Sequence, residues 1–341
     1  MTYSLDTVLI ATSLLPEGRE VTRIGGALAR AAGARVALVH GMAMPVWLGE
    51  ASLSSVGLSS LGETDRFLRE SKSALRQELA DEAREAGIRD SDLAGCFLEA
   101  GPSHRGVVEV AQRLSADLIV VGASDRRRGK GLGSTALRVL QKATRPVLVV
   151  RKGLHVPPRR VLAAVDLSPL SGDILRCGYD RVAALTAGHR PTMEVLFVLS
   201  PAEREGWQHF DAGQVDRFAH EELERFVGRY GGAFGGLTRP RVRVGDARNE
   251  IVDEVHAMQA DLLVVGTHGR GGFERFVLGS VATDVVRRTS TSVLVVPPEA
   301  AARAAIETER EARRSADWTF VADHPLQPTR EGTRDATETA S

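Results

Sequence analysis

The sequence is poor in cysteine, in aromatic residues and in long apolar runs, and it carries no net charge. Its 341 residues include two cysteines, Cys96 and Cys177, far apart in the chain, which favours free thiols in a reducing compartment over a disulfide. Runs such as "DLLVVG" are much shorter than the ~20 residues that cross a bilayer, and no cationic segment typical of a signal peptide opens the chain. We therefore expect a cytoplasmic protein without membrane contact.

Motifs for common catalytic chemistry are also missing. The 44 basic and 44 acidic residues cancel, so no global charge favours nucleic acid as a partner. There is no G-x-S-x-G, H-E-x-x-H or C-x-x-C motif and no kinase signature, and the nine histidines show no metal-ligand spacing. We expect no catalytic residue, no metal site of the protein's own, and at most a weak ATPase activity.

The chain does contain an internal repeat. The segment "GPSHRGVVEVAQRLSADLIVVG" (101–122) aligns without a gap with "GDARNEIVDEVHAMQADLLVVG" (245–266). Downstream, "GSTALRVLQKATRPVLVV" from Gly133 matches "GSVATDVVRRTSTSVLVV" from Gly279, and upstream "VLIATSLLP" matches "VLAAVDLSP". Because the parts recur in the same order, the repeat indicates duplication of a whole domain.

In each half, short apolar runs alternate with helical patterns. The runs are rich in Val and Ile with little alternation, as in parallel strands buried on both faces. The pattern predicts an α/β fold of two tandem doubly wound, mostly parallel five-stranded sheets, Rossmann-like, with helices on both faces. We place the first domain at 1–152 and the second at 159–298, and we expect residues 299–341 to be helical and then disordered.

Small residues follow the fourth apolar run of the second half, in "VVGTHGRGGFERFVLGS". Gly266 ends the strand, where a missing Cβ lets a sugar or base approach the backbone. Gly269 allows the loop to form a nest of N–H groups, and Gly279 with Ser280 opens a helix whose N-terminus favours phosphate. Alternatively, the two loop glycines are turn residues and Ser280 is an ordinary N-cap. Taken together in this order, the residues favour phosphate binding.

The spacing G-x2-G-x9-G-S resembles the ATP-binding signature of the universal stress protein family. The resemblance covers roughly residues 5–297 and implies a tandem member of the family. It implies that Asp166 contacts the adenosine moiety and that Val198 packs beside adenine. By itself, Asp166 also fits a helix-start acid, and without the family Val198 would be interpreted as an ordinary core valine. The ATP-binding set implied by the resemblance is Asp166, Val198, Val265, Gly266, Thr267, His268, Gly269, Gly279, Ser280 and Val281.

The first half departs from this signature. Ser13 stands in the place of Asp166, and Asp125 stands in the place of Gly269, where its charge repels phosphate. We expect a degenerate first half that binds no ATP. Its loop carries Arg126, Arg127, Arg128 and Lys130, which fit either a solvated charged loop or a site for another phosphate-bearing ligand or an acidic partner.

The favoured function is a stress-response regulator that binds ATP, with or without Mg2+, in the second half and hydrolyses it little or not at all. The nearest cations in the sequence are Arg270 and Arg275. One alternative is an interaction or scaffold protein of the same fold with unknown protein partners, and a less favoured one is an adenylating enzyme. The resemblance further implies that "RPVLVV" and "TSVLVV" pair within the chain as an intramolecular pseudo-dimer, with or without further homodimerisation.

Overall fold

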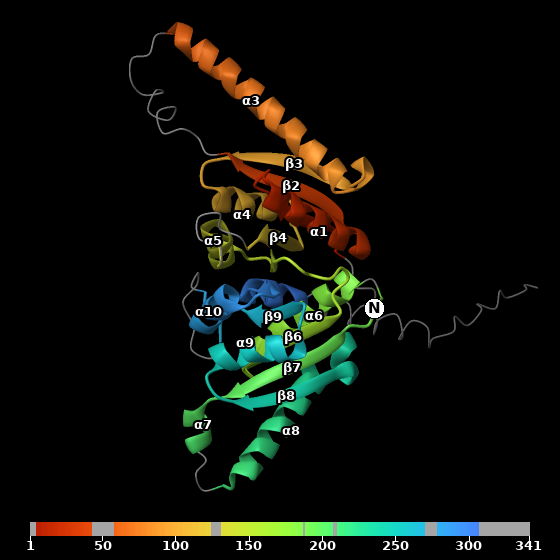
Figure 1. Cartoon of the computed structure of the whole chain (residues 1–341), viewed down its shortest axis with the longest axis vertical. Coiled ribbons are helices and arrows are strands. Elements are labelled where there is room, and N and C mark those ends of the chain that lie inside the picture. Colours follow the sequence, from red (N-terminus) through yellow and green to blue (C-terminus); the bar gives the residue numbers. More distant parts are fainter. Residues whose placement is uncertain are drawn as a thin grey trace, which may run out of the picture. The chain divides into compact units, whose positions relative to one another are not determined.

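The computed structural model describes residues 5–42, 58–123, 131–186, 188–206, 210–269 and 278–306. The ten strands of these residues form one sheet in the order β3-β2-β1-β4-β5-β10-β9-β6-β7-β8 (Figure 1). The strands are β1 (Thr7–Ala11), β2 (Arg35–Met42), β3 (Leu93–Ala100), β4 (Leu118–Gly122), β5 (Val147–Val150), β6 (Arg160–Val165), β7 (Thr192–Leu199), β8 (Thr238–Val244), β9 (Leu262–Gly266) and β10 (Ser292–Val296).

Each half of the sheet is parallel, and the strand order of the second half mirrors that of the first. The predicted α/β fold class is therefore confirmed. The difference is that the two predicted five-stranded sheets join into a single sheet. The domain boundaries at 152 and 159 stay a prediction, because the shared sheet runs across them.

The halves meet where β5 and β10 pair antiparallel, which confirms the expected pairing within the chain. Leu148 lies opposite its own repeat counterpart Leu294, with Val147 opposite Val295 and Val149 opposite Val293. This register places a local two-fold axis between Leu148 and Leu294. All other pairs are parallel. The carboxyl ends of the first-half strands therefore point in the direction opposite to those of the second-half strands.

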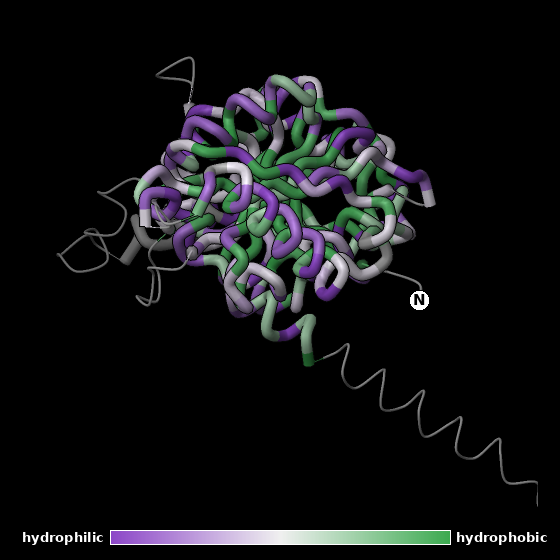
Figure 2. The backbone as a smooth tube through the Cα atoms, turned by 90° about the horizontal axis from the view of Figure 1, so that it is seen from below, coloured by the Kyte–Doolittle hydropathy of each residue, from purple (hydrophilic) through white to green (hydrophobic). Residues whose placement is uncertain are grey.

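Helices cover both faces of the sheet, as a doubly wound fold requires. One face carries α1 (Pro16–Ala32), α3 (Leu58–Glu85), α6 (Pro169–Thr186) and α8 (Ala212–Tyr230), and the other carries α4 (Ser103–Arg113), α5 (Ser134–Lys142), α9 (Ala247–Met258) and α10 (Ser280–Arg288). Alternate residues of a strand enter the two cores: Leu9 packs with α4 and α5, whereas Val8 and Ile10 pack under α1. In Figure 2 the apolar strands accordingly lie inside a layer of more polar helices.

Local signals set the limits of individual helices. Pro16 begins α1, where its fixed φ and missing N–H are tolerated, and Gly33 ends it in the left-handed conformation with φ 68°. The short helix α7 (Pro201–Glu205) is closed by a capping box in which the Ser200 hydroxyl accepts from the Glu203 N–H.

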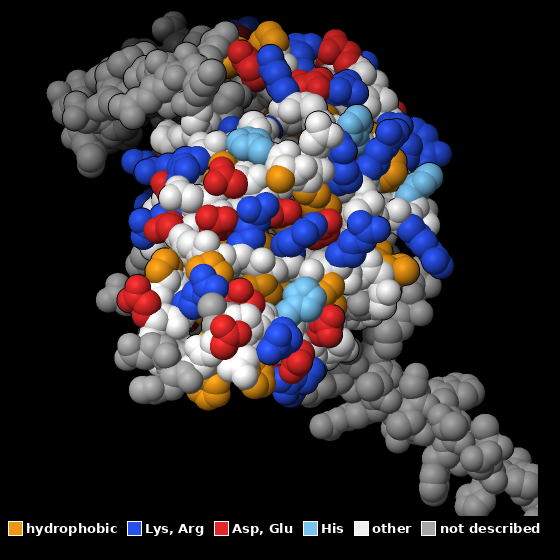
Figure 3. All heavy atoms as spheres, turned by 60° about the horizontal axis from the view of Figure 1, so that its bottom comes forward, with side chains coloured by type: hydrophobic (Ala, Val, Ile, Leu, Met, Phe, Trp, Pro, Cys, Tyr) orange, Lys and Arg blue, Asp and Glu red, His pale blue; other side chains and the backbone are white. Residues whose placement is uncertain are grey.

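Beyond β10 the chain continues as a helix over 298–306. The remainder of the predicted tail lies outside the described residues. On the face shown in Figure 3, which includes the end of the sheet at β8, basic and acidic side chains are interspersed over much of the surface. None of the helices in the described ranges combines the length and the apolar character that a bilayer span needs.

Candidate functional site

The predicted site residues lie at the carboxyl ends of three neighbouring strands in the second half. Asp166 directly follows β6, Val198 lies near the end of β7, and Gly266 ends β9. β6 pairs with both β7 and β9, so these positions share one edge of the sheet. Open α/β sheets bind ligands in the crevice at this edge.

Asp166 is held by the turn that begins α6. Its Oδ1 accepts hydrogen bonds from the Ser168 backbone N–H at 3.0 Å and from the Ser168 hydroxyl at 2.6 Å, and its own N–H donates to Ser171 Oγ at 3.2 Å. Oδ2 lies toward the β9 loop: a Cβ added to Gly269 would stand 3.2 Å from it. The structure therefore brings Asp166 and Gly269 together across two loops, as a shared site requires.

The loop after β9 is closed by its own backbone. The Gly279 N–H donates to the Thr267 carbonyl at 2.7 Å, and a Cβ at Gly279 would meet that carbonyl oxygen at 2.9 Å. Thr267 is only 4% exposed, and its Oγ1 hydrogen-bonds the Nδ1 of His268 at 2.8 Å, which orients the ring. Gly279 is thus required where two backbone segments approach each other.

The N-terminus of α10 carries no side-chain cap. Gly279 is the N-cap residue and Ser280 is the first residue of the helix, so the reading of Ser280 as an ordinary N-cap is wrong. The first N–H groups of this nine-residue helix are therefore left without a capping side chain. Ser280 is exposed, and it stands where the helix dipole favours an anion.

Gly266 has a packing role that the sequence did not reveal. A Cβ there would stand 2.6 Å from Ile174 Cδ1 of α6. At the equivalent position of the first half, a Cβ on Gly122 would stand 2.9 Å from Val21 Cγ2 of α1. Because the contact recurs in the half without the signature, a glycine at this strand end is explained by helix packing as well as by access to a ligand.

The three predicted valines differ in exposure. Val265 is buried at 5%, Val198 is half-buried and Val281 is exposed at 36%. Val265 thus belongs to the core, whereas the other two present apolar surface near the crevice.

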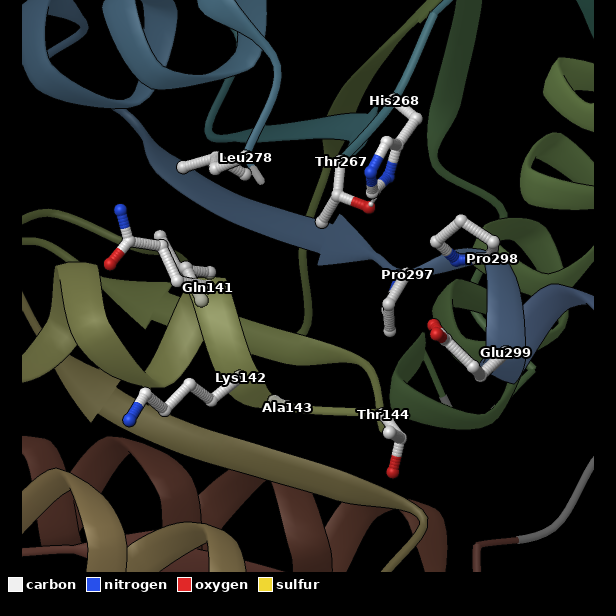
Figure 4. A pocket seen from close by; sticks show the side chains of 11 residues that line it. Gln141, Lys142, Ala143, Thr144, Thr267, His268, Leu278, Pro297, Pro298 and Glu299 are labelled. Atoms are coloured by element: carbon white, nitrogen blue, oxygen red, sulfur yellow. Dashed lines mark hydrogen bonds between the residues drawn. The ribbon is translucent and has the colours of Figure 1, made fainter. Parts of the chain in front are cut away.

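Thr267 and His268 also border a small cavity against the end of α5 (Figure 4). The two side chains lie side by side at the end of β9, while the Lys142 side chain points away from them. The cavity of about 20 Å³ has room for one water molecule and is not the predicted nucleotide site.

The first half has a different arrangement at the matching positions. Ser13 replaces Asp166, and the preceding Thr12 uses its Oγ1 to accept the Leu14 N–H at 3.1 Å. Gly41 aligns with Val198 by strand register, and a Cβ on Gly41 would stand 2.4 Å from the Ser103 hydroxyl oxygen. The start of α4 therefore fills the place that the valine side chain takes in the second half.

Sequence reasoning missed one cation of the site. Arg248, in the first turn of α9, places its Nη2 3.5 Å from Ser280 Oγ, although 32 residues separate them. The cations named from the sequence, Arg270 and Arg275, and the first-half loop with Asp125, lie outside the described residues. Within the described ranges, no group of three His, Cys, Asp or Glu side chains is placed to hold a metal ion.

Comparison with known proteins identifies the family. The model of the universal stress protein family matches residues 4–151 and again residues 158–297. The chain belongs to the universal stress protein family. The two matches agree with the internal repeat and confirm the tandem arrangement expected from the sequence.

Curated relatives carry the same family name. A universal stress protein of Mycolicibacterium smegmatis is 31% identical over 212 residues, which are 54% of this chain and 63% of that protein. A universal stress protein of Mycobacterium tuberculosis is 30% identical over 217 residues, covering 58% of this chain and 70% of the relative. The chain thus spans less than two thirds of the length of the first of these universal stress proteins.

Solved structures support the fold. A functionally unknown protein of Pseudomonas aeruginosa superposes with a TM-score of 0.62 at 18% identity, over 89% of this chain and 96% of its own. A universal stress protein of Archaeoglobus fulgidus superposes with a TM-score of 0.58 at 17% identity, over 86% and 98% of the two chains. At such identities the likeness concerns the fold alone.

Proposed function

We propose that the second half binds ATP, with or without Mg2+, and that this universal stress protein is a nucleotide-responsive regulator with little or no turnover. The binding set is the one predicted from the sequence, Asp166, Val198, Val265, Gly266, Thr267, His268, Gly269, Gly279, Ser280 and Val281. Family membership supports the stress-response role. A cytoplasmic location and further homodimerisation stay predictions.

The observation that carries the proposal is the uncapped N-terminus of α10, whose N-cap Gly279 lies against Thr267 and His268, just before Gly269 in the chain. The helix begins at Ser280 with no side chain on its first N–H groups, and these groups, with the dipole, attract phosphate oxygens. Gly269, itself without a side chain, lies against Asp166 Oδ2, so the same crevice offers a carboxylate to ribose hydroxyls or to an adenine amine. The N–H groups of the helix can bind phosphate, and the carboxylate can accept hydrogen bonds from hydroxyl or amino groups. Both lie at the carboxyl ends of neighbouring strands, an arrangement that suits a nucleotide.

The two halves support one site per chain. The first half lacks the acid, because Ser13 replaces Asp166, and the start of α4 fills the space above Gly41. In the second half, the side chain of Val198 occupies the equivalent space. We therefore assign nucleotide binding to the second half alone.

Calorimetric titration of nucleotide-stripped protein with ATP and Mg2+ tests this function through its stoichiometry. We expect one site per chain, and an Asp166→Ala variant with weaker affinity and an unchanged circular dichroism spectrum. Two sites per chain would show that the first half also binds. An absence of binding at several temperatures, confirmed by equilibrium dialysis, would overturn the proposal and leave the interaction or scaffold role.

A further inference from the structure

Among the residues that the structure describes, Arg248 is the one charged side chain that reaches the hydroxyl of Ser280. Its guanidinium Nη2 lies 3.5 Å from Ser280 Oγ. Among the described residues, the Arg248 side chain makes no ion pair, unlike Arg241 and Arg243 on the neighbouring strand β8, which pair with the buried Glu254. An exposed guanidinium without an acidic partner retains its donors for an anion.

The position of Arg248 relative to Ser280 is fixed by packing between α9 and α10. The two helices lie side by side on one face of the sheet, where they share an apolar core. Arg288 Nη1 donates to Asn249 Oδ1 at 2.9 Å, next to Arg248 in the chain. Asp246 caps α9 by accepting the Arg248 N–H at 2.8 Å, so the residue starts from a defined backbone position.

The first half holds a different residue at this place. The gapless repeat aligns Arg248 with His104, which is 8% exposed. Burial, followed by the neighbouring cations Lys142, Arg138 and Arg105, lowers the pKa of His104 and favours its neutral form. A buried neutral imidazole cannot replace an exposed guanidinium as a phosphate ligand. The cation is thus specific to the half that carries the glycine signature.

From this geometry we infer that Arg248 is a specificity-determining residue that contacts the phosphate held at Ser280, so that the site selects nucleotides with a phosphate chain over adenosine. This inference rests on the proposed function. A phosphate oxygen in hydrogen-bonding distance of the Ser280 hydroxyl is within reach of the Arg248 donors, and a guanidinium bonds phosphate more strongly than a neutral donor does.

The test is a set of calorimetric titrations with adenosine, AMP, ADP and ATP on the full chain and on Arg248→Ala. We expect the variant to lose roughly tenfold in affinity for the nucleotides whose phosphates reach Ser280, and to bind adenosine like the wild type. Arg248→Lys should retain part of the affinity, because it keeps the charge and loses the fork of donors. In Arg248→Ala/Ser280→Ala the two losses should be less than additive, because both groups hold one phosphate.

Arg287→Ala is the matched control, since Arg287 is an exposed arginine in the last turn of α10 and its replacement changes the net charge equally. It should leave all four affinities unchanged. Equal losses for adenosine and ATP in Arg248→Ala, or no loss for either, would overturn the inference while the proposed function stands. A wild-type chain that binds none of the four ligands would overturn both.

Discussion

The two halves of the chain share their strand order and their packing and differ at the strand ends where a nucleotide is proposed to bind. Gly122 and Gly266 meet equivalent side chains of α1 and α6, and Gly133 and Gly279 each donate a backbone hydrogen bond that closes the preceding loop. In contrast, the repeat aligns Ser13 of the first half with Asp166 of the second half. It likewise aligns the buried His104 with the exposed Arg248. The scaffold therefore does not depend on the residues that distinguish the second half, and these residues can be changed without changing the fold.

The largest effect is expected where the halves are most alike, at the β5–β10 pair. Leu148 and Leu294 face each other across the local two-fold axis and are 1% and 0% exposed. Leu148→Ala and Leu294→Ala should each lower the free energy of unfolding by about 2–5 kcal/mol, and by similar amounts, because each leaves an equivalent cavity. Denaturant unfolding of the two variants measures this. A loss confined to one of them would show that the seam is not symmetric in energy.

The next largest effect is expected on ATP affinity, at position 269, where the two halves carry different residues. Gly269→Asp gives the second half the residue type that the first half has at this place, and it sets a carboxylate against Asp166 Oδ2 and beside the proposed phosphate site. We expect ATP affinity to fall roughly a hundredfold through like-charge repulsion, and stability to fall as well, because the new carboxylate also repels Asp166. Calorimetry gives the affinity. Gly228→Asp is the control, because a Cβ at this exposed position in α8 meets nothing within 4 Å; an equal loss there would mean a general charge effect.

A smaller effect on stability is expected at the two strand-end glycines, and it tests their role in helix packing. Gly122→Ala and Gly266→Ala should each cost about 1–3 kcal/mol of stability, the second more, because its Cβ would stand closer to its neighbour. Adding Ile174→Val to Gly266→Ala should recover part of the loss by removing the opposing Cδ1. Thermal unfolding of the single and double variants tests this. Additive effects in the pair would contradict the proposed contact.

The smallest effect is a pH dependence of stability that arises from His104 in the first half. Burial and nearby cations lower the folded-state pKa of this histidine, so below about pH 6.5 the unfolded chain binds a proton that the folded chain does not. Stability should therefore fall as pH decreases from 7 to 5, and less steeply in His104→Asn. Melting temperatures across this range measure the difference. Parallel profiles for the two proteins would mean that His104 does not contribute.

Much of the fold could be predicted because the same pattern of strands and helices occurs twice in the sequence. The repeat with its buried Val- and Ile-rich runs predicts two doubly wound halves, and the similarity of "RPVLVV" and "TSVLVV" to edge strands of the family predicts the pairing of β5 with β10. The Gly279-Ser280 pair also predicts the start of α10 correctly. These are local patterns, and local patterns are what a single sequence displays.

Other features depend on packing between distant segments and could not be predicted. The contact of Arg248 with Ser280 arises from the way α9 lies beside α10, and no spacing in the sequence indicates it. The contact of Gly266 with Ile174 requires the position of α6 over the sheet. Ser168 and Ser171, which hold Asp166, carry a weak signal, since serines near a predicted helix start often bond the backbone there.

The antiparallel union of β5 and β10 has a consequence for how the two copies can evolve. In a dimer of identical chains, every substitution changes both sites at once, so a loss in one is a loss in both. A chain that contains both copies across its own two-fold axis is free of that constraint, and a mutation in one copy leaves the other intact. The seam through Leu148 and Leu294 keeps the assembly symmetric, while Ser13 and Asp166 show that its two ends have diverged.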